Sequence, residues 1–371
     1  MNALVLEDIG KLEYREIETA TALSGEVLVK VKAAGVCGSD IPRSYKDGAH
    51  KMPLILGHEF SGQVVAVGEN ASSEWIGKRV GIFPLIPCKK CSQCKAKRYE
   101  MCKHYDYLGS RRNGGFAEFV SVPEWNLIEL PENVSYEVAA MLEPMAVATH
   151  AIRRLKLSSE DSALVYGAGT IGMLLTMFLI DKKINNIYVA CNKDFQINML
   201  KQIGICEENI CDIRKEDLCD FINEKTSGEG IEAVFECVGN NETIATSLKV
   251  VAPSGQICYV GNPHSDMTFD KNVYWQILRK QITICGTWNS SFYGVNESEM
   301  GVGNSCNSEG PQNDVDGSQD DWNYVLDRLE KGKVVPNNLI THKFLFEDIK
   351  KGFEIMRDKK EDYVKIMAVM E

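Results

Sequence analysis

The sequence lacks any long hydrophobic run. The longest apolar stretch, from Ile171 to Ile180 with Thr176 inside it, is far shorter than the ~20 residues that a membrane-spanning helix needs. The first residues soon reach Glu7 and Asp8, without the basic start and apolar stretch of a secretory signal. We therefore expect a cytoplasmic protein that does not interact with membranes.

The chain also lacks a basic patch, internal repeats and heptads. It has 371 residues, of which 44% are hydrophobic and 25% charged, and its net charge is −11. This charge repels polyanions, so a nucleic-acid partner is not expected. The length and composition suit a globular protein of two domains with sizeable cores.

Two patterns of apolar and turn-forming residues indicate two kinds of structure. From Val27 to about Trp125, short apolar runs are separated by glycine and proline, which is typical of a strand-rich, barrel-like region. From about residue 155, apolar strands, glycine turns and helical segments alternate, which predicts a parallel sheet wrapped by helices. Its expected strands are 163–166, 187–190, 233–236 and 256–260, with a helix over 171–181 between the first two.

The last part of the chain begins with a polar segment. Residues 294–321 are rich in Gly, Ser, Asn, Asp and Glu, which predicts a long loop or insertion. Helices are expected over 322–329 and 346–356, followed by a closing strand over 364–369.

Thirteen cysteines in a chain without a signal favour thiols and thiolate ligands over a disulfide framework. Four of them follow the spacing C-x2-C-x2-C-x7-C and could surround one Zn²⁺ ion: Cys88, Cys91, Cys94 and Cys102. Four protein ligands leave no open position, so this zinc would be structural. Reduced thiols, a local disulfide and an iron–sulfur cluster are the alternatives.

Catalysis needs a second site with an open position. Cys37, in G-V-C-G-S-D, and His58, in G-H-E-F-S-G, each stand beside glycines and carboxylates. Taken alone, a buried thiol and a core histidine explain them equally well. Ser39 and Asp40 likewise fit a turn or a helix cap.

A dinucleotide motif follows the first strand of the expected parallel sheet: Gly167-Ala168-Gly169-Thr170-Ile171-Gly172. The first glycine permits the tight turn, the second lets a pyrophosphate approach the helix N-terminus, and the third allows helix and strand to pack closely. A chance glycine turn is the alternative. The strand, turn and helix together predict NAD or NADP as cofactor.

The second strand does not end in the carboxylate that usually binds the ribose hydroxyls of NAD. Cys191 stands there, followed by Asn192 and Lys193. Asn192 could bind the ribose, and Lys193 could meet the 2′-phosphate of NADP. Asp194 fits a helix cap or a first-turn residue. The choice between NAD and NADP therefore stays open.

Together, the Cys37 and His58 segments, the four-cysteine lobe and the glycine motif resemble the zinc-containing medium-chain alcohol and polyol dehydrogenases over nearly the whole chain. The resemblance implies an α/β fold with a Rossmann doubly wound parallel sheet domain at 151–287. A discontinuous GroES-like β-barrel catalytic domain would comprise 1–150 and 288–371, with a structural zinc lobe at 86–104. A cleft between the domains and a homo-dimer or homo-tetramer are also implied.

The resemblance also assigns roles. The catalytic zinc would be held by Cys37, His58 and Glu143, the last in the polyol-type segment L-E-P, while Glu59 ranks behind them as a ligand or relay. Ser39 would begin a proton relay, which His50 could carry to solvent. Asp40 would orient the zinc-bound histidine.

Longer segments resemble family members that oxidise a phosphorylated hexitol, of the type galactitol 1-phosphate to tagatose 6-phosphate. They are CGSDIPR (37–43), GAHKMP (48–53), LGHEFSG (56–62) and YLGSRRNGGFAEF (107–119). Cations that could bind the phosphate are Arg43, Lys46, Arg111 and Arg112, although each also fits a solvated surface.

Three alternative functions remain. An unphosphorylated polyol of the sorbitol type or L-threonine could be the substrate, because such relatives share the zinc and cofactor machinery. A catalytically silent zinc- and nucleotide-binding protein is disfavoured, since a binding module would not need the full set of Cys37, Ser39, His58 and Glu143.

Overall fold

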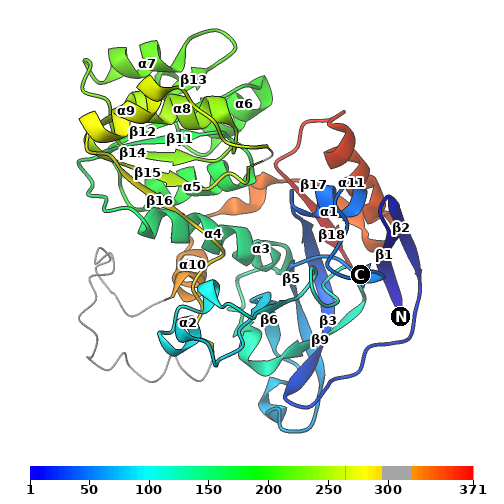
Figure 1. Ribbon diagram of the computed structural model, residues 1–371. Helices are drawn as coiled ribbons and strands as arrows, with labels where there is room; N and C mark the ends of the chain where they lie inside the picture. The colour runs from blue at the N-terminus through cyan, green and yellow to red at the C-terminus, as the bar shows by residue number, and fades with distance from the viewer. Residues whose placement is uncertain (264, 295–319, 371) are drawn as a thin grey trace. The chain divides into compact units, whose positions relative to one another are not determined.

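The structure is a computed structural model that describes residues 1–263, 265–294 and 320–370 (Figure 1). It contains two compact units. Unit 1 comprises Met1–Pro144 and the described parts of 290–304 and 318–371, and unit 2 comprises Met145–Asn289 apart from residue 264. Most of the loop expected over 294–321 lies outside the described residues. None of the described helices combines the length and apolarity required to cross a membrane.

Unit 2 contains a six-stranded sheet in the order β13-β12-β11-β14-β15-β16, with every neighbouring pair parallel. This confirms the predicted parallel sheet, and β13 and β16 join the four expected strands. The strands are β11 Ser162–Tyr166, β12 Asn186–Cys191, β13 Ile210–Asp212, β14 Ile231–Glu236, β15 Val251–Tyr259 and β16 Thr283–Gly286.

Helices cover both faces of this sheet (Figure 1). Side chains alternate along a strand, so Leu164 of β11 packs in one apolar cluster with Phe221 and Leu248, while Val165 lies against Gly172 on the opposite face. Burial on both sides explains why the strands read as continuous apolar runs. The helices are α4 Leu142–Arg153, which begins in unit 1, α5 Thr170–Asp181, α6 Asp194–Gln202, η4 Glu207–Asn209, α7 Leu218–Lys225, α8 Asn241–Val250 and α9 Lys271–Arg279.

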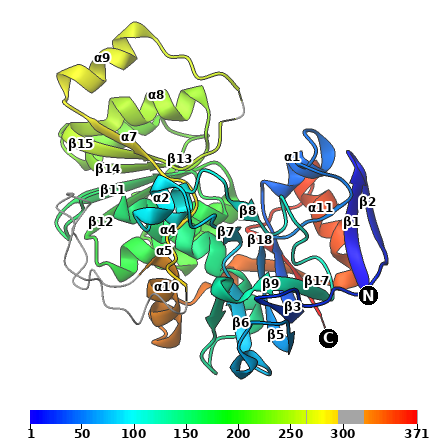
Figure 2. The same cartoon turned by 60° about the horizontal axis from the view of Figure 1, so that its bottom comes forward.

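Unit 1 is rich in strands, as its short apolar runs separated by glycine and proline predicted. Its largest sheet has the order β10-β6-β5-β3-β18-β17, and β9 also pairs with β3 (Figure 2). These strands are β3 Glu26–Val36, β5 Glu59–Val67, β6 Arg79–Ile82, β9 Phe119–Pro123, β10 Leu127–Glu129, β17 Ile340–Leu345 and β18 Lys365–Val369. Two smaller sheets join β2 Lys11–Glu16, β1 Asn2–Asp8 and β4 Leu54–Ile55, and β7 Leu85–Ile86 with β8 Asp106–Tyr107.

The core of unit 1 lies between these sheets and a C-terminal helix. Phe116 and Phe353 are fully buried and meet edge to face, with ring centroids 5.3 Å apart. Ile366 of β18 belongs to the same cluster, so the end of the chain is part of the core. The helices are α1 Asp40–Tyr45, η1 Ser73–Trp75, α2 Ser92–Lys95, η2 Tyr99–Met101, η3 Glu124–Asn126, α3 Tyr136–Ala140, α10 Asp321–Glu330, η5 Pro336–Leu339, η6 Phe346–Asp348 and α11 Ile349–Asp358.

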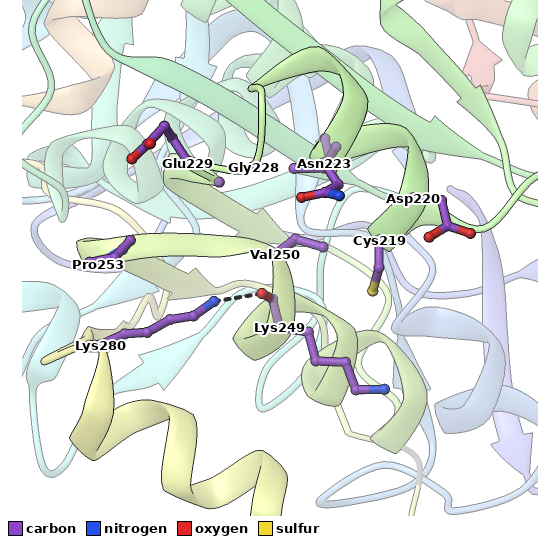
Figure 3. A pocket seen from close by; sticks show the side chains of 11 residues that line it. Cys219, Asp220, Asn223, Gly228, Glu229, Lys249, Val250, Pro253 and Lys280 are labelled. Atoms are coloured by element: carbon purple, nitrogen blue, oxygen red, sulfur yellow. Dashed lines mark hydrogen bonds between the residues drawn. The ribbon is translucent and has the colours of Figure 1, made fainter.

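A polar hollow of about 330 Å³ lies in unit 2, where residues 228–230 lead into β14 (Figure 3). Lys280 points across it, and its Nζ donates to the carbonyl oxygens of Lys249 (2.6 Å) and Val251 (2.7 Å). Burial lowers the pKa of Lys280. Because the two carbonyls belong to the last turn and cap of α8, the lysine satisfies a helix end, which is a structural role. The hollow is at the amino end of β14, whereas the glycine motif follows the carboxyl end of the parallel strand β11.

We expect the substitution Lys280→Met to lower the free energy of unfolding by about 1–2 kcal/mol, because two helix-end carbonyls lose their donor. Urea denaturation of the whole protein measures this loss. Lys249→Met is the matched control, since that side chain is exposed in the same hollow. Equal losses in the two variants would contradict a capping role for Lys280.

Candidate functional site

Strand register gathers the first candidate ligands. β3 and β5 are antiparallel, with Gly35 opposite Glu59, so Cys37 just after β3 and His58 just before β5 become neighbours. A side chain at position 35 would collide with the Glu59 carboxylate and displace it, so the glycine leaves room for that carboxylate. The ligand atoms of Cys37, His58 and Glu59 all lie within 4.8 Å of one another.

Lys365 of β18 joins this cluster. β18 pairs with β3, and the Lys365 Nζ donates to the carbonyl of Val36 (3.1 Å) and forms an ion pair with Glu59. The side chains of Lys365 and Glu59 are only 2% and 1% exposed. Burial alone would lower the pKa of Lys365, but the charges of Glu59 and Cys37 outweigh it and raise the pKa. The sequence interpretation missed Lys365, although a single lysine in an apolar strand is a signal that a buried acid must face it.

Asp40, the first residue of α1, connects the two ligand segments. Its carboxylate accepts hydrogen bonds from the Cys37 backbone N–H (3.1 Å) and from Arg43 Nη1 (2.8 Å). Its Oδ1 lies 3.6 Å from His58 Nδ1. The Asp40 carboxylate therefore lies beside the His58 ring, and its orienting role stays a prediction.

Glu143 lies beside the cluster, in the first turn of α4. Tyr107 Oη donates to Glu143 Oε1 (3.2 Å), and the Tyr107 ring meets the His58 ring edge to face at 5.9 Å. Burial raises the pKa of Glu143 to about 7, against the opposing effect of His58. The group whose ligand atoms all lie within 4.8 Å of one another contains the Glu59 carboxylate and not that of Glu143.

The cluster suits a cation. Burial would lower the pKa of His58, but Asp40, Cys37 and Glu143 together raise it to about 10. Within the described residues, His58 Nδ1 is buried without a hydrogen-bond partner, and Glu59 Oε2 has only its ion pair. A thiolate, an imidazole and a carboxylate are ligands that zinc prefers, and three of them leave a fourth position open. These residues therefore fit a catalytic zinc ion.

The two members of the expected proton relay differ in their surroundings. Ser39 is the N-cap residue of α1, and its Oγ donates to Cys37 Sγ at 3.3 Å. His50 is exposed in the segment that follows α1. No hydrogen bond joins Ser39 to His50 in the described part of the chain, so the structure brings Ser39 to the cluster but gives His50 no direct contact with it.

The four-cysteine lobe forms a second cluster. The Sγ atoms of Cys88 and Cys94 are 3.9 Å apart, and those of Cys91 and Cys94 are 3.6 Å apart. Cys102 Sγ accepts from the Cys88 backbone N–H (3.2 Å), and all four thiols are free. A tetrahedron with Zn–S bonds of about 2.3 Å has sulfur–sulfur edges of about 3.8 Å. The lobe therefore fits a single tetrahedral ion and needs no disulfide.

Two of the cations considered for phosphate binding are neutralised by buried acids. Arg43 is paired with Asp40, as described above. Arg112 Nη2 lies 3.0 and 3.1 Å from the two carboxylate oxygens of Glu26. Both guanidinium groups therefore fix the fold around the site.

The other two cations keep their charge available. Lys46 is exposed. The Arg111 guanidinium lies 4.3 Å from the Tyr105 ring centroid, and Tyr105 meets Tyr107 at 6.0 Å. Because Tyr107 contacts His58, two tyrosines connect Arg111 to the ligand cluster.

The glycine motif has the geometry expected of a pyrophosphate site. Gly167 has φ +106°, a left-handed conformation, and a Cβ at Gly172 would overlap with the Gly167 carbonyl. Gly169 caps α5 without a side-chain hydrogen bond, and a Cβ there would meet nothing within 4 Å. Thr170 and Ile171 begin α5, so the open space lies before a helix N-terminus, where backbone amides and the helix dipole favour an anion.

Beyond Cys191, the structure shows a charge network that the sequence interpretation missed. Asp194 is a first-turn residue of α6, and its carboxylate is paired with Arg214 at 2.5 Å. Arg214 also pairs with Asp212 (2.7 Å), which lies opposite Cys191 in the β12–β13 register. Both nearby carboxylates are therefore engaged. Asn192 is exposed and Lys193 precedes α6, so neither the side chains nor the register decides between NAD and NADP.

Comparison with known proteins agrees with this geometry. Residues 23–132 match the alcohol dehydrogenase GroES-like domain, and residues 170–300 match the zinc-binding dehydrogenase family. The chain is 32% identical over 264 residues to galactitol 1-phosphate 5-dehydrogenase of Escherichia coli (strain K12), covering 71% of this chain and 75% of that protein. It is 29% identical to D-arabitol-phosphate dehydrogenase of Enterococcus avium, covering 96% and 93%.

The fold is also similar to that of a solved structure. The crystal structure of galactitol-1-phosphate dehydrogenase from Escherichia coli has a TM-score of 0.85 with 26% identity, covering the whole of both chains. The predicted fold class, a Rossmann domain with a GroES-like catalytic domain, is thereby confirmed. The chain belongs to the family of zinc-dependent medium-chain alcohol and polyol dehydrogenases, oxidoreductases that use zinc with NAD or NADP.

Proposed function

We propose that the protein transfers a hydride from a secondary alcohol of a polyol phosphate to NAD or NADP, as in the oxidation of galactitol 1-phosphate to tagatose 6-phosphate. The observation that carries the proposal is Arg111, a guanidinium without an ion-pair partner in the described residues, connected by Tyr105 and Tyr107 to the ligand cluster. Relatives named for phosphorylated polyols support the same substrate class.

The chemistry follows from the residues around the cluster. Bound zinc would act as a Lewis acid toward the alcohol oxygen, and the bound nicotinamide would accept the hydride. Cys37, His58 and Glu59 would hold the metal, with Lys365 balancing the carboxylate charge and Asp40 orienting the imidazole. Glu143, beside this group, is the alternative third ligand.

Ser39 and His50 would move the proton. Ser39 Oγ lies at the cluster and can accept the proton that leaves the alcohol, once it turns away from Cys37 Sγ. His50 is exposed, so it could pass that proton to solvent. Lys46, on the exposed segment between them, is a second candidate for binding the phosphate.

The test is reduced-nicotinamide absorbance with zinc-loaded protein, NAD⁺ or NADP⁺, and four substrates: galactitol 1-phosphate, galactitol, sorbitol and L-threonine. We expect reduction with the phosphorylated polyol and much weaker reduction with the others. Turnover of sorbitol or threonine alone would keep the dehydrogenase mechanism and overturn the substrate. Either cofactor outcome is compatible with the charge network at Arg214.

Arg111→Gln sharpens this test. Loss of a charge-assisted hydrogen bond of about 1.5–3 kcal/mol should raise KM for the phosphorylated substrate by about 10- to 100-fold, with little change for an unphosphorylated polyol. Arg98→Gln is the matched control for loss of one positive charge, because Arg98 is an exposed arginine of the same unit. An unchanged KM in Arg111→Gln would remove the observation on which phosphate recognition rests.

Metal content distinguishes the two clusters. We expect the wild-type chain to hold one zinc ion in each. Cys37→Ser should lose one ion and nearly all activity, while Cys94→Ser should lose one ion and lower the melting temperature, because the lobe loses its central ligand. Inductively coupled plasma mass spectrometry gives the zinc count. Full zinc content in Cys37→Ser would contradict a site there, and a greater loss in Glu143→Gln than in Glu59→Gln would make Glu143 the third ligand.

The proposed assembly is a homo-dimer or homo-tetramer. Supporting it, β16 is the outer strand of the unit 2 sheet, and large apolar side chains near it are exposed in the described chain: Tyr274, Trp275, Leu278, Ile284 and Trp288. β16 itself has no charged side chain, so its open edge could pair with a second copy of the chain. Sedimentation equilibrium measures the assembly directly, and a monomer would contradict it.

A further inference from the structure

A buried carboxylate lies where three parallel strands of unit 2 end. Glu236, the last residue of β14, is fully buried, and its register partners are Tyr166 at the end of β11 and Tyr259 at the end of β15. Gly167, the first glycine of the dinucleotide motif, follows Tyr166, and a Cβ there would collide with the Val238 side chain. Glu236 therefore belongs to the sheet edge that carries the cofactor motif.

The two carboxylate oxygens of Glu236 have different surroundings. Oε1 accepts three hydrogen bonds, from the backbone N–H groups of Val238 (2.9 Å) and Gly239 (2.8 Å) and from Thr243 Oγ1 (2.7 Å). Oε2 is buried, and among the described residues it has neither a hydrogen-bond partner nor an ion pair. A protonated Oε2 would need an acceptor, whereas a carboxylate only accepts. A buried charge without a cation is costly for folding, and such costs gather at functional sites.

The charge of Glu236 reaches the neighbouring strand ends. Burial raises the pKa of Tyr259 to about 12, and the charge of Glu236 adds to this rise. Burial also raises the pKa of Tyr166 to about 12, with Glu242 and Glu236 among the charges that add to it. The carboxylate therefore makes the potential more negative at the ends of the two strands beside β14.

This charge lies on the side of the sheet edge where the nicotinamide half of a cofactor is expected. In a doubly wound sheet, the pyrophosphate lies at the glycine turn and the adenosine ribose at the end of the second strand. The second strand here is β12, on one side of β11, so the nicotinamide half extends toward β14 and β15 on the other side. The oxidised nicotinamide ring is a cation, and hydride transfer makes it neutral.

We propose that the unpaired carboxylate of Glu236 makes the cofactor site favour the oxidised nicotinamide cofactor over the reduced one. Its role is electrostatic and requires no contact with the ring. The inference rests on the use of NAD or NADP in the proposed function and not on the identity of the alcohol.

Isothermal titration calorimetry of the zinc-loaded full-length protein, without alcohol, measures Kd for NAD⁺, NADH, NADP⁺ and NADPH. Glu236→Gln keeps an acceptor at Oε1 and removes the charge. For the pair that binds, we expect the ratio of the oxidised Kd to the reduced Kd to rise by about 3- to 10-fold, because a buried charge acts through a low dielectric. An unchanged ratio, whether both Kd values move together or neither moves, would overturn the proposal.

Glu232→Gln is the matched control. Glu232 lies near the other end of β14, and its carboxylate accepts a hydrogen bond from the Ser162 backbone N–H (2.9 Å). Its loss should lower the melting temperature and leave the Kd ratio as in the wild type. An equal rise of the ratio in both variants would assign the effect to the strand and overturn the role of Glu236.

Thr243→Val provides a second test if Glu236→Gln folds poorly. It keeps the carboxylate and removes one donor from Oε1, so the charge is less compensated and the Kd ratio should fall below that of the wild type. A rise of the ratio in this variant would contradict the proposal. Failure of the wild type to bind any of the four cofactors would overturn the proposed function itself, and this inference with it.

Discussion

The antiparallel pairing of β3 with β5 on one side and β18 on the other brings the candidate zinc ligands together. One pairing aligns the end of β3 with the start of β5 and so brings Cys37 to His58 and Glu59. The other pairing delivers Lys365 from the C-terminal strand to Glu59. Three segments far apart in sequence thereby share one buried position, which local sequence preferences alone could not create.

The buried charges of this site have an electrostatic cost. Glu59 and Lys365 are almost completely enclosed. Removal of either partner would leave an unpaired buried charge and strongly destabilise the folded protein. Cys37, Asp40 and Glu143 add further acidic groups around His58 and raise its pKa. A cation in the cluster offsets this negative charge, so the same electrostatics that would destabilise the empty fold would favour metal binding.

Much of this could be predicted from the sequence where the signal is local. The alternation of apolar runs with a glycine turn predicted the parallel sheet and α5, and the spacing of the four cysteines brought them into one lobe. Signals that depend on register were not visible. Lys365 and Tyr107 carry no motif, and the place of Glu59 in one compact group with Cys37 and His58 follows from its register opposite Gly35. β13 and β16 were missed because they are only three and four residues long.

Strand register brings Cys37, His58 and Glu59 together, and we propose that they hold the catalytic zinc ion. The most direct measurement is an anomalous difference map from crystals of the zinc-loaded protein, with data collected on both sides of the zinc absorption edge. We expect one peak within the four-cysteine lobe and a second among Cys37, His58 and Glu59, with Lys365 still paired to the Glu59 carboxylate. A single peak in the lobe, with the Cys37 cluster vacant in active protein, would contradict it.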